Sequence, residues 1–163
     1  KCLDRPAETY VRGRIYDVPF VMAAHWLISR SCIETVGGFS PAFRHYGEDD
    51  NYIHRAVYHG FKVGLCGGVH AVHDREMRPC TRTSAMRLKC VASVVKVSNP
   101  LNCPAVRAVL QPLELLAISV IRLSTDVLLY IPAFVRSLPQ LLRLRRESMS
   151  KGAFLGGAMG KNQ

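Results

Sequence analysis

The stretch that decides the fold runs from Val36 to Gly60 and reads VGGFSPAFRHYGEDDNYIHRAVYHG. Its three consecutive acids, Glu48, Asp49 and Asp50, follow a glycine and precede a run with apolar residues at helical spacing. That run places Ile53, Ala56 and Val57 on one buried helix face. Gly60 stands where a glycine that ends a helix is expected. The stretch therefore predicts a helix from Asp49 to His59 with the acids at its start.

The acids have a structural and a catalytic interpretation. Carboxylates in a first helical turn are favoured by the exposed N–H groups and the helix dipole, by about 0.3–1 kcal/mol each. They are then only the acidic start of an ordinary helix. A catalytic base, by contrast, must be rigidly placed and partly desolvated. A helix start that follows a glycine-rich loop supplies both conditions.

The residues before the acids predict a strand and a short helix. The apolar run Val18–Ile28 indicates a buried strand. It leads into a helix at Ser31–Val36, for which Ser29 or Ser31 is the candidate N-cap. After the acids, Phe61–Cys66 and Val69–His73 indicate two short strands separated by a glycine pair.

Five pieces of this region follow one another in a characteristic order: VMAAHWLISR, ETVGGFSPAF, HYGEDDNYIHR, YHGFKVGL and VHAVHD. Between Val18 and about Asp74 this order and spacing resemble the second half of family-2 glycosyltransferases, inverting enzymes with the GT-A fold. The chain departs from the family pattern at Ser40, where many relatives have an acid. It departs again at Asn51-Tyr52, where many have aspartate and an apolar residue.

The resemblance implies a fold class and a domain organisation. The expected class is α/β, the C-terminal half of a GT-A glycosyltransferase domain followed by an α-helical, basic tail. Residues 1–84 would form the glycosyltransferase part and residues 85–163 the helical extension, in a membrane-peripheral position. The family's nucleotide-binding half and its Asp-x-Asp motif are absent from this sequence. We therefore expect a fragment that is inactive without that half.

The resemblance also implies roles for particular residues. Asp49 would be the catalytic base, Glu48 would orient it or contact substrate, and Asp50 is the reserve candidate. The remaining substrate-binding candidates are Gly38, Trp26, His25 and Tyr46. For His25 and Trp26 the alternative is a pair of core aromatic residues. The substrates would be a nucleotide-sugar donor and a glycan or lipid-linked acceptor.

His73 matches the family's histidine that can bind a divalent ion beside the donor diphosphate. The resemblance therefore implies a Mg or Mn ion in the full-length enzyme. The alternative for His73 is a histidine that only ends a strand.

The charge of the chain is concentrated in its second half. The net charge is +10, and residues 86–163, with 11 Lys and Arg against 3 Asp and Glu, carry +8 of it. Such asymmetry points to an anionic partner. The apolar and basic segment 107–146 fits an anionic membrane surface, or else a helix packed on the first domain. Nucleic acid is disfavoured because the basic residues lack interleaved aromatic residues for base stacking.

The second half is expected to be helical. Helices are predicted over Met86–Val97, over Pro112–Tyr130 and over Phe134–Arg146, the last divided by Pro132 and Pro139. A simple membrane span over Pro112–Tyr130 is disfavoured because Arg122 and Asp126 interrupt it.

The six cysteines form no C-x-x-C pair and no zinc spacing, which favours reduced thiols and a cytoplasmic location. The apolar and basic segment 107–146 adds the expectation of a peripheral position on the inner face of the membrane. Two other functions remain open. One is a non-catalytic basic module that binds a membrane surface or nucleic acid. The other is a metal-dependent hydrolase using Glu48, Asp49 and His73.

Overall fold

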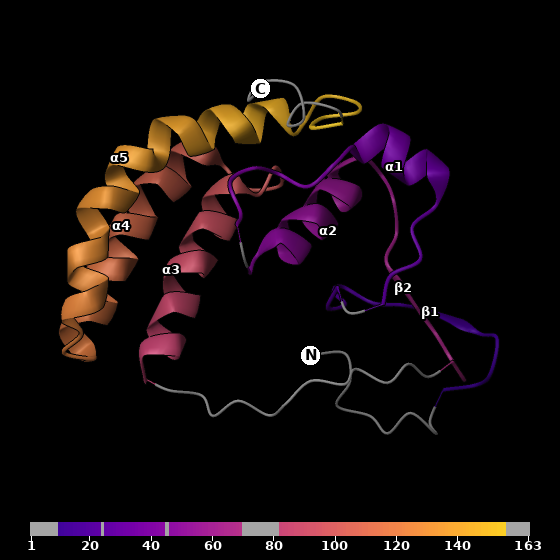
Figure 1. Cartoon of the computed structure of the whole chain (residues 1–163), viewed down its shortest axis with the longest axis horizontal. Helices are drawn as coiled ribbons and strands as arrows, with labels where there is room; N and C mark the ends of the chain where they lie inside the picture. Colours follow the sequence, from indigo (N-terminus) through magenta and orange to yellow (C-terminus); the bar gives the residue numbers. More distant parts are fainter. Residues whose placement is uncertain (1–9, 24, 45, 70–81, 156–163) are drawn as a thin grey trace, which may run out of the picture.

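The computed structural model describes residues 10–23, 25–44, 46–69 and 82–155 (Figure 1). Within them the chain forms five helices and two short strands. The helices are α1 (Arg30–Val36), α2 (Glu48–Tyr58), α3 (Arg82–Ser98), α4 (Pro104–Ile121) and α5 (Thr125–Glu147). The strands are β1 (Ile15–Asp17) and β2 (Gly64–Cys66). The described chain is mostly helical, so the expectation of an α/β GT-A half-domain was wrong.

The sheet has only two short strands, because most residues predicted to form strands do not pair with another strand. β1 pairs antiparallel with β2 over three residues, from Ile15 opposite Cys66 to Asp17 opposite Gly64. The apolar run Val18–Ile28 forms no strand, which corrects that prediction. Trp26 and Ile28 instead pack against the side chains of α1 and α2. The strand predicted at Val69–His73 lies, beyond Val69, outside the described residues.

The two helices of the first half begin and end within one residue of the predicted positions. Ser29, one of the two candidate caps, accepts a hydrogen bond from the Cys32 N–H at 3.2 Å at the start of α1. α2 begins one residue before the predicted start, and Gly60 follows its end with φ of 86°. A small core joins the two helices through Cys32, Val36, Tyr52 and Ala56.

A buried arginine ties α2 to the glycine pair. Arg55 is 0% exposed, and its guanidinium donates to the carbonyl oxygens of Val36 and, at 2.6 Å, of Gly38. The rings of Tyr52 and Phe154 lie 5.7 Å and 4.9 Å from its central carbon. Burial lowers the pKa of Arg55 to about 10, so the side chain remains a cation at neutral pH.

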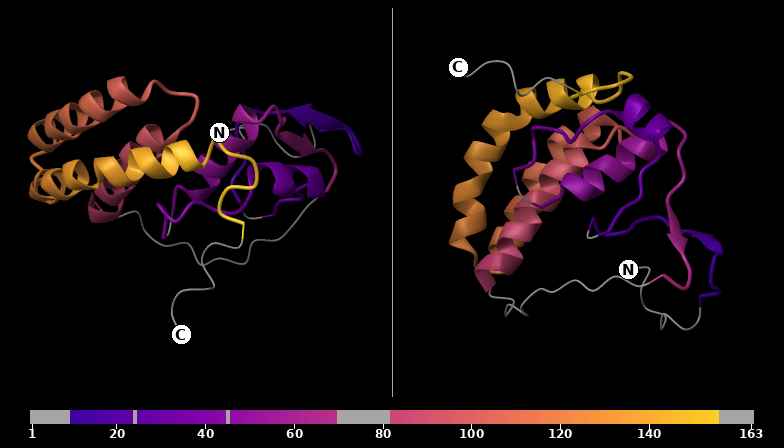
Figure 2. Two further views of the ribbon diagram at one scale, coloured as in Figure 1. Left: turned by 90° about the horizontal axis from the view of Figure 1, so that it is seen from above. Right: turned by 45° about the vertical axis from the view of Figure 1, so that its right-hand side comes forward.

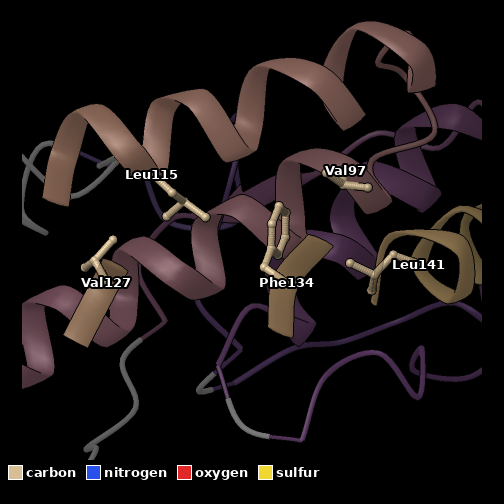
Figure 3. Close-up of a cluster of buried hydrophobic side chains, with 5 residues drawn as sticks. All are labelled: Val97, Leu115, Val127, Phe134 and Leu141. Carbon is tan, nitrogen blue, oxygen red and sulfur yellow. The ribbon is translucent and has the colours of Figure 1, made fainter. Parts of the chain in front are cut away.

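The second half forms a three-helix bundle that packs beside α2 (Figure 2). Its core contains one or more side chains from each helix, drawn in Figure 3: Val97, Leu115, Val127, Phe134 and Leu141. Lys96 of α3 and Glu114 of α4 form an ion pair at 2.6 Å. The hydrogen bond from Lys96 lowers the pKa of Glu114.

The bundle corrects two sequence predictions. A helix continuous over Pro112–Tyr130 was wrong, because the chain turns between α4 and α5. Ser124 explains the break: its side chain accepts the Val127 N–H at 3.5 Å and so starts α5. The predicted division at Pro132 and Pro139 was also wrong, since α5 runs through both. α5 is visibly bent in Figure 1, as expected for a helix with internal prolines.

The C-terminal segment returns to the glycine pair. The Gly152 N–H donates to the Thr35 oxygen at 2.8 Å, and the Gly38 N–H donates to the Ala153 oxygen at 2.9 Å. A Cβ on Gly37 would lie 1.7 Å from the Ala153 oxygen, and φ of 89° there disfavours any other residue. The glycines therefore allow the end of the chain to close over α1 and α2.

We expect Arg55→Met to lower the free energy of unfolding by about 3 kcal/mol or more. The change leaves two buried carbonyl oxygens without their charged donor, and such bonds contribute about 1.5–3 kcal/mol each. Urea denaturation measures the loss. Arg143→Met is the control, because Arg143 is exposed and its replacement should change stability by less than about 0.5 kcal/mol. Similar losses in both variants would contradict the role of Arg55.

We expect Gly37→Ala to destabilise the protein by about 2–4 kcal/mol, through strain at positive φ and a clash with Ala153. Gly60→Ala is the matched control: its φ is also positive, at 86°, but its added Cβ meets nothing within 4 Å. It should cost only about 1 kcal/mol. Thermal denaturation of both variants separates the strain from the clash, and equal losses would show that the Ala153 contact is unimportant.

Candidate functional site

The acidic start of α2 is held against α3. The N-cap of α2 is Gly47, in the left-handed conformation with φ of 86°. A Cβ on Gly47 would lie 2.8 Å from side-chain atoms of both Val91 and Val95 of α3. Only glycine fits this approach, so the packing of α2 on α3 fixes where the acids begin. Tyr46 precedes them with φ of 69° and is 43% exposed.

The three acids are half-buried in the first turn of α2. An Asp49 carboxylate oxygen accepts the backbone N–H of Asp50 at 2.9 Å. Burial raises the pKa of Asp50, and the neighbouring charges of Asp49 and Glu48 raise it further. Asp50 therefore holds a proton more readily than an ordinary aspartate, a property that suits a general base.

Unpartnered buried polar atoms continue from the acids along α2. Glu48 Oε2, Asn51 Oδ1 and His54 Nδ1 are buried and have no hydrogen-bond partner in the described part of the chain. Asn51 is only 1% exposed. Their spacing of three residues places them along neighbouring positions of one side of the helix. Burial lowers the pKa of His54, which favours the neutral imidazole.

Asn51 and His54 were not predicted from the sequence as site residues. Asn51 was noted only as a departure from the family pattern, and His54 was passed over. A signal was available, because Glu48, Asn51 and His54 repeat at a three-residue spacing within the predicted helix. Whether polar side chains at that spacing face solvent or the interior depends on the packing of α2, which the sequence does not show.

The aromatic candidates separate in the structure. Trp26 lies against Tyr52, with ring centroids 5.9 Å apart, and Phe39 lies 5.1 Å from the same ring. Trp26 thus joins the aromatic cluster beside α2, and its indole N–H is buried without a partner among the described residues. His25 is exposed. Of the two neighbours, only Trp26 belongs to the aromatic cluster beside α2.

Gly38 lies away from the acids. Its carbonyl binds Arg55, which is about 10 Å along the helix axis from Glu48 at the usual rise per residue. A Cβ on Gly38 would meet the Phe154 backbone oxygen at 2.7 Å, so the C-terminal segment covers it. The structure therefore brings together Tyr46 and the three acids and leaves Gly38 under the end of the chain.

The part of the chain that the structure describes contains no set of side chains that could bind a divalent metal ion. There, no three His, Cys, Asp or Glu side chains are grouped so that they could hold an ion. The predicted ligand His73 lies outside the described residues. The divalent ion therefore stays a prediction that the described residues do not test.

No protein-family model, no curated protein and no solved structure matches this chain.

We expect Asp50→Asn to stabilise the protein at pH 7. The pKa of Asp50 is higher in the folded than in the unfolded state, so its ionisation costs stability as pH rises through and above the usual aspartate range. The gain should stay below about 1 kcal/mol because the side chain is partly exposed, and it should disappear below that range. Thermal denaturation across pH measures it.

Asp126→Asn is the control for this comparison. Asp126 also lies in the first turn of a helix, α5, and is exposed. Its replacement should cost about 0.3–1 kcal/mol through the lost dipole interaction. A loss of stability in both variants at pH 7 would contradict the raised pKa of Asp50.

Proposed function

We propose that the start of α2 supplies the acceptor-side carboxylate of an inverting sugar transfer from a nucleotide-sugar. The proposal combines the resemblance to family-2 glycosyltransferases with one structural observation. That observation is the run of unpartnered polar atoms of Glu48, Asn51 and His54 beside the carboxylates of Asp49 and Asp50. The proposal concerns the residues at the start of α2 and does not depend on the α/β fold class that the structure corrected.

The unpartnered atoms favour a ligand that donates hydrogen bonds. The oxygens of Glu48 and Asn51 can only accept, and a buried acceptor without a partner costs about 1–3 kcal/mol. Sugar hydroxyls are donors, and several stand close together on each ring. A glycan or lipid-linked acceptor sugar would meet the half-buried carboxylates of Glu48, Asp49 and Asp50, whereas Asn51, at 1% exposure, is out of its reach. Phe39, which is 52% exposed beside Tyr52, offers a ring face for sugar stacking, whereas Tyr52 is buried in the core.

The chemical step uses Asp49 as the base. The acceptor hydroxyl oxygen attacks the anomeric carbon of the donor sugar and forms the new glycosidic bond. The bond between that carbon and the phosphate oxygen breaks on the opposite face, and the nucleoside diphosphate leaves with its electron pair. The hydroxyl proton passes to the Asp49 carboxylate. Attack from the opposite face inverts the configuration.

Other parts of a transferase must bind the donor. The sequence has no Asp-x-Asp motif, and its described residues hold no metal-ligand group. No step of the proposal passes through a metal ion. We therefore expect the chain by itself to show no transfer and expect activity only where a nucleotide-binding part accompanies it.

The test uses the protein encoded by the complete reading frame that contains this chain. Transfer of labelled sugar from a panel of nucleotide-sugars to glycan and lipid-linked acceptors is measured for the parent protein and for Asp49→Asn. Loss of a general base should lower kcat by about 10²- to 10⁴-fold. Asp126→Asn, which removes the same charge from the start of α5, should leave kcat within about twofold.

Two results would contradict the proposal. One is the absence of transfer from every donor. The other is transfer that Asp49→Asn and Asp126→Asn affect equally. In either case the three acids serve only to stabilise the start of α2. The chain is then better explained as a non-catalytic basic module.

A further inference from the structure

The outer surface of α4 is mostly apolar. All of its exposed residues are aliphatic: Ala105, Val106, Val109, Leu110, Leu113, Leu116, Ala117, Val120 and Ile121. We call these residues the α4 stripe. Val109, Leu113 and Val120 are 63%, 57% and 64% exposed. Along its 18 residues the stripe is about 27 Å long. A helix of a soluble bundle ordinarily carries polar residues on its outer side.

Two polar residues of α4, Gln111 and Ser119, lie on its inner side, while Arg107 and Glu114 are partly exposed. Gln111 is 0% exposed and donates to Glu114 at 3.0 Å, and Glu114 accepts from Lys96 at 2.6 Å. Ser119 is buried and donates to the Leu116 oxygen. The usual arrangement of a surface helix is therefore partly reversed, with hydrogen-bonded polar side chains inside and aliphatic side chains outside.

Exposed leucines continue around the turn into α5, beside the exposed Arg122, Thr125 and Asp126. Leu123, Leu128 and Leu129 are 84%, 49% and 76% exposed. α4 and α5 are both long and apolar enough to cross a membrane, and only 17% and 22% of their apolar windows are buried. Arg122 lies in the turn between the helices, so it interrupts neither of them.

Basic residues follow on the second half of α5. Arg136, Arg143 and Arg146 are exposed there. Arg145 belongs to the fold, because its guanidinium donates to the oxygens of Asn99, Pro100 and Asn102 at 3.1, 2.9 and 2.8 Å. The surface of the α4–α5 hairpin thus combines an aliphatic stripe with solvent-exposed arginines, the combination that binds an anionic lipid surface.

A protein partner fits the stripe less well. Cores of protein interfaces are enriched in aromatic residues, methionine and arginine and are surrounded by a polar rim. α4 contains no aromatic residue and no methionine, and its exposed residues include no polar one. Aliphatic side chains without hydrogen-bonding groups suit the acyl region, and the net charge of +8 on residues 86–163 complements acidic headgroups.

We propose that the α4–α5 hairpin docks on an anionic lipid bilayer, with the α4 stripe in the acyl boundary and Arg136, Arg143 and Arg146 among the headgroups. α4 lies in the plane of the interface, since its inner side stays packed on α3 and α5. This proposal is independent of sugar transfer and concerns where the chain resides.

The test is co-sedimentation of the full chain with vesicles of phosphatidylcholine, alone or mixed with phosphatidylglycerol, at low and at high salt. The mixed vesicles should bind the chain at least about tenfold more tightly, and salt should reduce the difference. Val109→Gln, Leu113→Gln and Val120→Gln together should lower the affinity at least about tenfold. Circular dichroism should show an unchanged fold, since these side chains point away from the core.

Matched variants control for composition and for charge. Val11→Gln, Met22→Gln and Leu27→Gln together replace as many exposed apolar residues outside the bundle and should leave binding unchanged. Arg136→Gln, Arg143→Gln and Arg146→Gln together should weaken binding to the mixed vesicles at least about tenfold. Arg12→Gln, Arg30→Gln and Arg44→Gln together remove the same charge from the first half and should change binding by less than about threefold.

Three outcomes would overturn the proposal. The first is no binding to either vesicle. The second is binding that the triple substitution in the α4 stripe leaves unchanged. The third is a dimer, seen by analytical ultracentrifugation without lipid, that this triple substitution converts to a monomer. In that case a second copy of the chain covers the stripe.

Discussion

The first half of the structure depends on the buried guanidinium of Arg55. A cation in the interior is stable only when its donors are used, and here two of them bind the carbonyl oxygens on either side of Gly37. The glycine pair cannot turn away without leaving that charge unpaired, and α2 cannot shift without taking the loop with it. The ring of Phe154 covers the same guanidinium, so the end of the chain is tied to the same point.

The position of the candidate site is fixed by two contacts of α2 with other parts of the chain, not by contacts among the three acids. At one end of α2, Arg55 fixes the helix to the glycine loop. At the other end, Gly47 allows α2 to meet Val91 and Val95 of α3. The acids between these ends therefore have a fixed position although they form no ion pair among the described residues. A carboxylate held by packing, not by a cation, keeps its negative charge available for a ligand.

The two proposals assign different chemistry to the two halves of the chain. The first half presents the half-buried carboxylates of Glu48, Asp49 and Asp50, which suit a ligand rich in hydroxyl groups. The second half presents aliphatic and basic side chains, which suit a lipid surface. A lipid-linked acceptor would satisfy both halves at once. The buried side of α4 matters here, because Gln111 is fully buried and bonded to Glu114, which leaves the most exposed positions of α4 to aliphatic residues.

The sequence by itself determined the helices with strong local signals, because caps, glycines and apolar periodicity act within a few residues. It predicted both ends of α2 to within one residue, two candidate caps of α1 of which Ser29 is the one used, and the central part of α3. Only the tertiary structure decided the fold class, since a strand needs a partner that Val18–Ile28 did not find. It alone showed α5 continuing through two prolines, and Asn51 and His54 beside the acids, since both depend on packing against distant segments.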